Sequence, residues 1–169
     1  AAMNPCRCGM AGEPGHVCAR GARCQADYQA RISGPLLDRI DLRITVPAVT
    51  AIDLIKPGAS ETSAQVASRV AMARERQKQR FLQLGQPSVT CNALCPTSLI
   101  ETVASPDAAG MTLLHDAAEK MKFSARAYHR ILKVARTLAD LEDAETVGRL
   151  HIAESISYRI AGNALSAAA

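Results

Sequence analysis

The sequence contains no tryptophan, and aromatic residues make up only 3% of its 169 residues. A core built on aromatic side chains is therefore excluded. Hydrophobic residues still reach 48%, so a core must consist mainly of alanine, leucine, isoleucine and valine. Because alanine has the highest helix propensity, this composition favours helical structure. The length allows one domain, or one small domain together with part of another.

Long hydrophobic runs are also missing. None approaches the ~18 residues that a membrane span requires, and no signal peptide opens the chain. We therefore expect a cytoplasmic protein without membrane contact. In a reducing cytoplasm, its six cysteines favour metal binding or catalysis over disulfide bonds.

Hydrophobic periodicity and helix-stop residues divide the chain into three parts. Residues 1–47 comprise an irregular, glycine-rich stretch up to residue 31, then a short helix and a strand over 41–47, as if the chain began inside a domain. Residues 48–61 predict a linker. Residues 62–162 predict a helical bundle, with helices over about 62–82, after Pro96, and over about 107–121, 124–141 and 147–160. Thr62 and Gln65 form a capping-box pattern at the first of these helices, and Ser124 is a good N-cap for the helix over 124–141. The predicted fold is mostly α-helical.

Four cysteines in the irregular opening follow the pattern C-x-C-x9-C-x5-C, at Cys6, Cys8, Cys18 and Cys24. Four thiolates suit a tetrahedral structural zinc, whose binding would order a segment that has no core of its own. His16 is a possible substitute ligand. The alternative is a surface loop with four unligated, reduced cysteines.

Cys91 and Cys95 are distant in sequence from this cluster and lie next to an apolar segment. We expect them to be buried and inert.

Arg39 lies in ISGPLLDRIDL (residues 32–42), between the expected short helix and strand. The nearby carboxylates of Asp38 and Asp41 could hold it in a local ion pair, which at a surface contributes little stability. Alternatively, its planar guanidinium could be presented to a phosphate and bind it through two hydrogen bonds. The pattern leaves both possibilities open.

The helix expected from Ser124 carries a basic stripe. Spacings of four, three and four residues place Arg126, Arg130, Lys133 and Thr137 on one face, beside an apolar face. Cations on one stripe repel one another unless an anion lies nearby, and the helix dipole disfavours Arg126 in the first turn. The stripe is either a solvated face or an anion-binding one.

Histidines receive no catalytic role, because no Ser/His/Asp arrangement surrounds them. We expect His129 to pack or to face solvent, and His115 and His151 stay unassigned.

The net charge of +4 is concentrated in residues 66–80, which contain a single acid. This basic helix could contact nucleic-acid phosphates or form a solvated face. The same helix is expected to pack through Val66, Val70 and Ala73. The candidate nucleic-acid residues are Arg69, Arg74, Arg76, Lys78 and Arg80.

Four segments carry a family resemblance: MNPCRCG (3–9), RISGPLLDRIDL (31–42), CNALCP (91–96) and SARAYHRILKVARTLADLE (124–142). In this order they resemble the magnesium chelatase-like AAA+ ATPases, and within them the ComM-type competence proteins, which are DNA branch-migration helicases. The resemblance covers residues 1–160. It implies the C-terminal remnant of an AAA+ α/β core with a cysteine-rich loop, followed by a helical lid.

The resemblance also implies roles for three residues. Asn4 matches the sensor-1 residue, which positions the attacking water near the γ-phosphate. Arg39 matches the arginine finger, which reaches the nucleotide of a neighbouring subunit in a ring, expected to be a hexamer. Arg126 matches the sensor-2 arginine of the lid, which reaches the nucleotide of its own subunit. Such arginines stabilise charge on a transferring phosphoryl group.

ATP and Mg²⁺ are the implied cofactors, zinc is possible at the cysteines, and DNA is the implied substrate. In the family the later cysteine pair is usually closely spaced, whereas five residues separate Cys18 from Cys24 here.

The sequence has no G-x-x-x-x-G-K-[ST] motif and no apolar strand ending in Asp-Glu. It therefore lacks the phosphate cradle and the Mg²⁺-holding acid, and we expect it to be inactive by itself. It would act as the C-terminal part of an ATP-driven motor on DNA, in branch migration during transformation and recombination. The alternatives are a true magnesium chelatase ATPase subunit, or a zinc-stabilised module that binds nucleic acid or protein.

Overall fold

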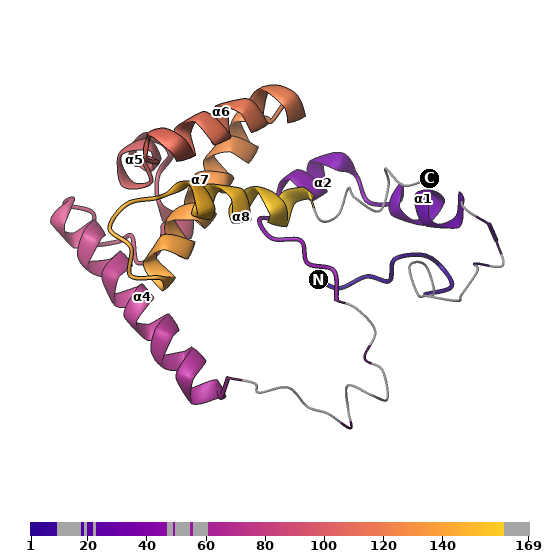
Figure 1. Cartoon of the computed structure of the whole chain (residues 1–169), viewed down its shortest axis with the longest axis horizontal. Helices are drawn as coiled ribbons and strands as arrows, with labels where there is room; N and C mark the ends of the chain where they lie inside the picture. The colour runs from indigo at the N-terminus through magenta and orange to yellow at the C-terminus, as the bar shows by residue number, and fades with distance from the viewer. Residues whose placement is uncertain are drawn as a thin grey trace.

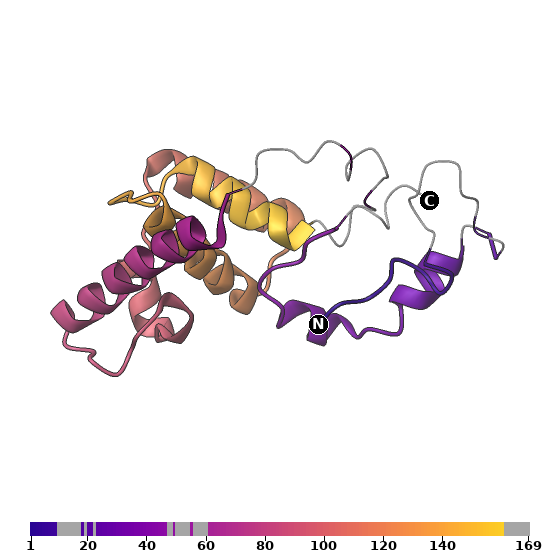
Figure 2. The ribbon, with the colours of Figure 1, turned by 90° about the horizontal axis from the view of Figure 1, so that it is seen from below.

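The computed structural model describes residues 1–9, 18, 20–21, 23–46, 49, 55 and 61–160. Figures 1 and 2 show a bundle of α4 to α8, with α1 and α2 to one side of it. The predicted mostly helical fold is confirmed. The helices are α1 (Arg23–Gln29), α2 (Gly34–Asp38), α4 (Ser63–Gln83), α5 (Thr97–Val103), α6 (Ala108–Met121), α7 (Ala125–Leu141) and α8 (Arg149–Ile160), with a 3₁₀ turn η1 (Asn92–Leu94).

Helices of the bundle begin where the sequence predicts their caps. At α4, the Thr62 hydroxyl accepts from the Gln65 amide at 3.3 Å, and the Gln65 side chain accepts from the Thr62 amide at 2.8 Å. At α7, the Ser124 hydroxyl accepts from the Ala127 amide at 3.1 Å. Gly85 follows the end of α4 with φ of 69°, which costs glycine no steric strain. The contacts of Thr62 and Ser124 satisfy amides that the helix itself leaves unpaired.

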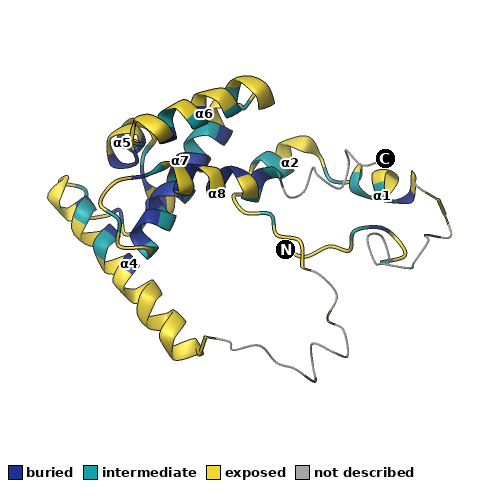
Figure 3. Ribbon diagram, viewed as in Figure 1, coloured by how far each residue is buried: buried dark blue, intermediate teal, exposed yellow. Residues whose placement is uncertain are grey.

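The central helix of the bundle is α7, which packs against α4, α5, η1 and α8. Figure 3 shows it as the most buried element, and Ala135 and Ala139 are fully buried on it. Their small side chains allow the neighbouring helices to approach closely. The core is aliphatic apart from one fully buried aromatic residue, as the composition predicts; its large members include Phe81, Ile100, Leu114, Ile131, Leu132, Val147 and Ile152.

Two predictions for the N-terminal part are wrong. No strand forms in the described residues 41–46; instead, the Arg43 amide donates to the Tyr158 carbonyl of α8 at 2.9 Å. A strand needs a neighbouring strand to pair with, and the described residues contain only an isolated bridge between Pro106 and Val147. Residues 23–29, predicted to be irregular, form α1. The predicted linker over 48–61 lies mostly outside the described residues.

The N-terminal half of α4 extends beyond the bundle. Ala73 and Phe81 are buried against it, whereas Val66 and Val70, on the same stripe, are 37% and 44% exposed. Figures 1 and 3 show this half projecting past α7, into solvent. The prediction that all three small apolar residues of α4 pack is therefore correct only for Ala73. None of the helices in the described residues is long and apolar enough to cross a membrane.

A buried carboxylate, Asp140, joins three elements of the bundle. Arg80 of α4 donates to both of its oxygens, at 3.0 Å for Oδ2, Asn92 of η1 donates at 2.8 Å, and Arg136 donates from Nε at 3.1 Å. Burial raises the pKa of Asp140, but hydrogen bonds from Arg80 and Asn92 and the charge of Arg136 outweigh it and lower the pKa. The stability that this carboxylate contributes is therefore present above the ordinary pKa of aspartate and lost as pH falls through the lowered value.

Replacing this carboxylate tests its structural role. Asp140→Ala should lower the free energy of unfolding by about 3–5 kcal/mol, because it leaves the buried guanidinium of Arg136 without its anion. Urea unfolding monitored by circular dichroism measures the loss. Glu61→Gln is the matched control, since it removes an exposed ion pair with Arg69; it should leave the midpoint unchanged. Equal midpoints for both variants would contradict the role.

Candidate functional site

The four N-terminal cysteines gather into one cluster. All four Sγ atoms lie within 4.8 Å of one another, with Cys6–Cys8 and Cys8–Cys18 separations of 2.9 and 3.2 Å. Both distances exceed the about 2.05 Å of a disulfide bond. Zinc–sulfur bonds of about 2.3 Å in a tetrahedron separate the sulfurs by about 3.8 Å. The four thiols, completed by Cys24, lie within 4.8 Å of one another, so a small separation of the two closer pairs lets this donor set hold zinc.

Local structure holds two of these cysteines close together. The Gly9 amide donates to the Cys6 carbonyl at 3.1 Å, which closes a turn around Cys8. Gly9 has φ of 81°, in the left-handed region that favours glycine. Among the described residues, no histidine, aspartate or glutamate joins the four cysteines. His16 lies outside the described residues.

Hydrogen bonding prepares Cys18 for a metal. A hydrogen bond from the Arg20 backbone, and further ones from the Cys8 and Cys24 thiols, lower the pKa of Cys18. A lower pKa favours the thiolate, which is the form that binds metal.

At the end of α2, Arg39 is exposed. Ser33 caps this short helix, and Pro35 occupies its first turn, where proline is favoured. Arg39 follows as the C-terminal cap, and its Nη1 donates to the Pro35 carbonyl at 3.1 Å. The alternative in which Asp38 and Asp41 pair with Arg39 is not what the structure shows.

Instead, both acids bind the bundle. Arg159 of α8 donates to Oδ1 of Asp38 at 2.7 Å, and the Ser124 hydroxyl donates to its Oδ2 at 3.1 Å. Asp41 forms an ion pair with Arg130 of α7. The only sign of these contacts in the sequence is that the N-terminal part contains acids and the bundle contains arginines. The sequence alone equally allowed both acids to pair with the adjacent Arg39.

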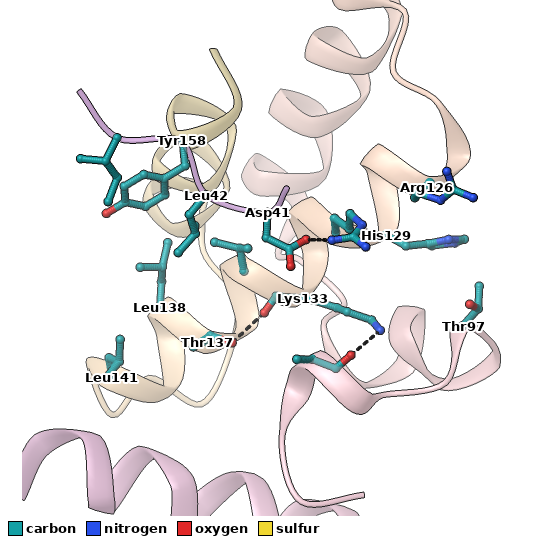
Figure 4. A pocket seen from close by; sticks show the side chains of 14 residues that line it. Asp41, Leu42, Thr97, Arg126, His129, Lys133, Thr137, Leu138, Leu141 and Tyr158 are labelled. Carbon is teal, nitrogen blue, oxygen red and sulfur yellow. Dashed lines mark hydrogen bonds and ion pairs between the residues drawn. The ribbon is translucent and has the colours of Figure 1, made fainter. Parts of the chain in front are cut away.

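A groove of about 690 Å³ runs along α7 (Figure 4). Its walls are α7, the segment around Asp41 and parts of η1, α5 and α8. Figure 4 shows cationic side chains toward one end and apolar ones toward the other. The predicted common face of the basic stripe is confirmed: the lining includes Arg126, His129, Arg130, Lys133, Thr137, Val134, Leu138, Leu141 and Tyr158.

Most polar groups of this groove have partners within the protein. Arg130 pairs with Asp41, Lys133 donates to the Ala93 carbonyl at 3.0 Å, and Thr137 donates to the Lys133 carbonyl at 2.8 Å. Arg126 differs: it is exposed, and the described residues provide it with no hydrogen bond or ion pair. Its guanidinium is thus available for an anion.

Asn4 is exposed and lies two residues before Cys6. Within the described part of the chain, no hydrogen bond joins it to Arg39 or Arg126. Asn4 thus lies beside the cysteine cluster in the chain, Arg126 lies on α7 of the bundle, and Arg39 follows Asp38, which binds α8.

The basic residues of α4 fall into two groups. Arg69 binds Glu61, Arg76 binds Asp143, and Arg80 belongs to the Asp140 network. Arg74 and Lys78 are exposed and have no carboxylate partner among the described residues, although Arg74 donates to the Cys91 thiol. Contact with nucleic acid remains a prediction for all five residues. Arg74 and Lys78 are the two whose positive charge is not neutralised by a carboxylate among the described residues.

The remaining two cysteines and His151 lie in or beside the bundle. Cys95 is 2% exposed, as predicted, whereas Cys91 is half-buried. Burial raises the pKa of Cys91, but hydrogen bonds from the Leu94 amide and from Arg74 outweigh it and lower the pKa. His151 is buried; its Nδ1 accepts from the Gly148 amide and its Nε2 lies 2.9 Å from Glu142.

Comparison with known proteins decides the family. The family described as magnesium chelatase, subunit ChlI C-terminal, matches residues 60–159, and magnesium chelatase, subunit ChlI, matches residues 1–54. The chain belongs to the magnesium chelatase-like family. The competence protein ComM of Haemophilus influenzae is a 40% identical member over 133 residues, which is 78% of this chain and 25% of that protein.

Two further family members match over most of the chain. YifB of Escherichia coli is 37% identical over 170 residues, covering 94% of this chain and 30% of that protein. A Mycobacterium tuberculosis protein is 35% identical over 161 residues, covering 95% of this chain and 31% of its own length. The chain thus spans about a quarter to a third of the length of the curated relatives it matches.

Metal analysis tests the cysteine cluster. The purified chain should contain about one zinc per molecule, and Cys6→Ser should lower this content because it removes a buried ligand. Elemental analysis by mass spectrometry measures the zinc. Cys91→Ser, outside the cluster, should retain it; equal zinc in both variants, or none in the unsubstituted chain, would contradict the site.

Proposed function

We propose that this chain is the C-terminal part of an AAA+ ATPase of the magnesium chelatase-like family and contributes three residues to ATP hydrolysis. Asn4 positions the attacking water, Arg39 acts as an arginine finger, and Arg126 acts as the sensor-2 arginine. The observation that carries the proposal is the exposure of Arg39 between two acids that are engaged elsewhere.

The two acids would otherwise neutralise the finger. A carboxylate beside Arg39 would compete with a phosphate for its hydrogen-bond donors. Because Asp38 binds Arg159 and Asp41 binds Arg130, the local competition is weakened. Among the described residues, the Arg39 side chain donates a hydrogen bond only to a backbone carbonyl. It can therefore reach the γ-phosphate bound by a neighbouring subunit.

Arg126 serves the nucleotide of its own subunit. It lines the cationic end of the groove without a protein partner among the described residues. Positive charge at this position stabilises the charge that develops on the transferring phosphoryl group. ATP and Mg²⁺ need a phosphate cradle and an acid that this sequence lacks, so the chain depends on a P-loop outside it.

A finger that acts in trans requires a ring of subunits, for which we propose a hexamer. The name of the Haemophilus relative as a competence protein supports DNA as the substrate of the motor. Branch migration in recombination is the activity that we infer. The cysteine cluster holds zinc, whose chemistry there is structural, and its four-thiolate loop favours this branch over porphyrin metallation.

Substitution of the two arginines tests the ATPase role. In the full-length protein that carries this chain, Arg39→Ala should lower kcat by roughly 10³- to 10⁵-fold, because an arginine finger contributes that much to the rate of phosphoryl transfer. Arg126→Ala should lower it as well. Steady-state phosphate release measures both effects, and the isolated chain should release none.

Mixed rings identify the subunit on which each arginine acts. Subunits with Arg39→Ala should regain turnover when mixed with subunits that have an intact finger but a disabled P-loop. Glu61→Gln is the control and should hydrolyse ATP normally. Full activity of Arg39→Ala, or turnover by the isolated chain, would overturn the proposal.

Salt dependence tests the contact between α4 and DNA. The pair Arg74→Ala and Lys78→Ala should reduce the slope of log affinity against log salt by about 0.9 for each phosphate that the helix no longer neutralises. Fluorescence anisotropy of labelled duplex DNA, measured on the full-length protein, gives this slope. Arg69→Ala is the comparison, since Arg69 already binds Glu61; a smaller change in its slope supports the assignment, and equal slopes argue against it.

A further inference from the structure

A single carboxylate connects the finger segment to both helices that flank the groove. Oδ1 of Asp38 accepts from Arg159 of α8, and Oδ2 accepts from Ser124, the N-cap of α7. The Asp38 backbone carbonyl also lies 3.4 Å from the Arg159 guanidinium. Asp38 is the last residue of α2, and Arg39 follows it directly.

The surroundings of this carboxylate make it hard to replace. Arg159 is 6% exposed, and Asp38 is the carboxylate that pairs with it. Its other terminal nitrogen, Nη1, has no hydrogen-bond partner among the described residues, so loss of Asp38 would leave the buried guanidinium without its anion. Arg43 lies nearby: burial and the charge of Arg159 lower the pKa of Arg43, while Asp38 acts in the opposite direction. The charge of Asp38 thus acts on two guanidinium groups, and its ion pair with Arg159 links the end of α2 to α8.

The same carboxylate lies on the shortest path between the two arginines of the proposed function. Arg39 is adjacent to Asp38 in the chain, and Arg126 follows Ser124 by two residues in the first turn of α7. The hydrogen bond between Ser124 and Asp38 closes this path. The path from Ser124 to Arg39 therefore runs through one hydrogen bond and the chain link between Asp38 and Arg39, with no loop between them.

We propose that Asp38 is a positioning residue that couples the lid of one subunit to ATP hydrolysis in the next. This inference rests on the proposed function, because it needs Arg39 as the finger and Arg126 as the nucleotide-sensing residue. When Arg126 engages the nucleotide of its own subunit, the first turn of α7 moves with it. Asp38 carries that movement to Arg39, which enters or leaves the neighbouring site.

Hydrogen exchange in the full-length protein tests the contact itself. Asp38→Asn removes the charge that holds Arg159 and should speed exchange of the α2 amides on the order of tenfold. Ser124→Gly is a second variant: it removes the hydroxyl bridge to Asp38 together with the cap bond from the Ala127 amide, and glycine is tolerated at an N-cap. It should speed exchange in α2 and in the first turn of α7, while the rest of the bundle is unchanged. Unchanged α2 exchange in both variants would overturn the coupling.

Kinetics then separate positioning from a general loss of stability. Both variants should lower kcat on the order of 10- to 100-fold, with KM for ATP unchanged, because a finger displaced by about 1 Å loses that much rate. Adding Asp38→Asn to Arg39→Lys should cause little further loss, since both changes act through the same guanidinium. Glu61→Gln is the matched control and should behave as the unsubstituted protein.

The outcomes distinguish this inference from the proposed function. If Arg39→Ala lowers kcat but Asp38→Asn and Ser124→Gly do not, the finger stands and the coupling is overturned. Additive losses from Asp38→Asn and Arg39→Lys would also overturn it, because they indicate a separate structural effect. If Arg39→Ala leaves kcat unchanged, the proposed function fails, whatever hydrogen exchange reports about the contact.

Discussion

The arrangement of the bundle depends on the fully buried carboxylate of Asp140. It receives hydrogen bonds from Arg80 of α4 and Asn92 of η1, and from Arg136 within its own helix. A buried charge is tolerated only when such partners surround it. The network therefore fixes the register of α4 and η1 against α7, which is the helix that carries the groove. Arg80, the basic residue of α4 that binds this carboxylate, is therefore structural and is not available for a ligand.

A second set of charges attaches the N-terminal segment to that bundle. Asp38 and Asp41 meet Arg159 and Arg130, and the backbone of Arg43 bonds to α8. The acids that flank Arg39 are thereby engaged, which leaves an arginine exposed at the end of α2. The positions of Arg39 and Arg126 are consequently set by one connected group of contacts, although the two residues lie far apart in sequence.

Local signals in the sequence predicted the bundle well. The starts of two helices were predicted from their caps, Thr62 and Ser124, because a cap requires only nearby residues. The cysteine spacing predicted a cluster for the same reason. What failed depended on distant partners: residues 41–46 form no strand among the described residues, and the acids beside Arg39 pair across the fold. Val66 and Val70 were expected to pack but are exposed. The apolar stripe of a helix does not show how far the neighbouring helix extends along it.

The free half of α4 also has a mechanical consequence. Ten residues before the first buried position, Ala73, form a rod about 15 Å long at 1.5 Å per residue. Its base is held by the Asp140 network, so a rotation of α7 would carry the rod with it. At about 15°, the size of a known subunit rotation, its tip would move through about 4 Å. The geometry of the free half would thus turn small angular changes near the groove into larger displacements at its far end.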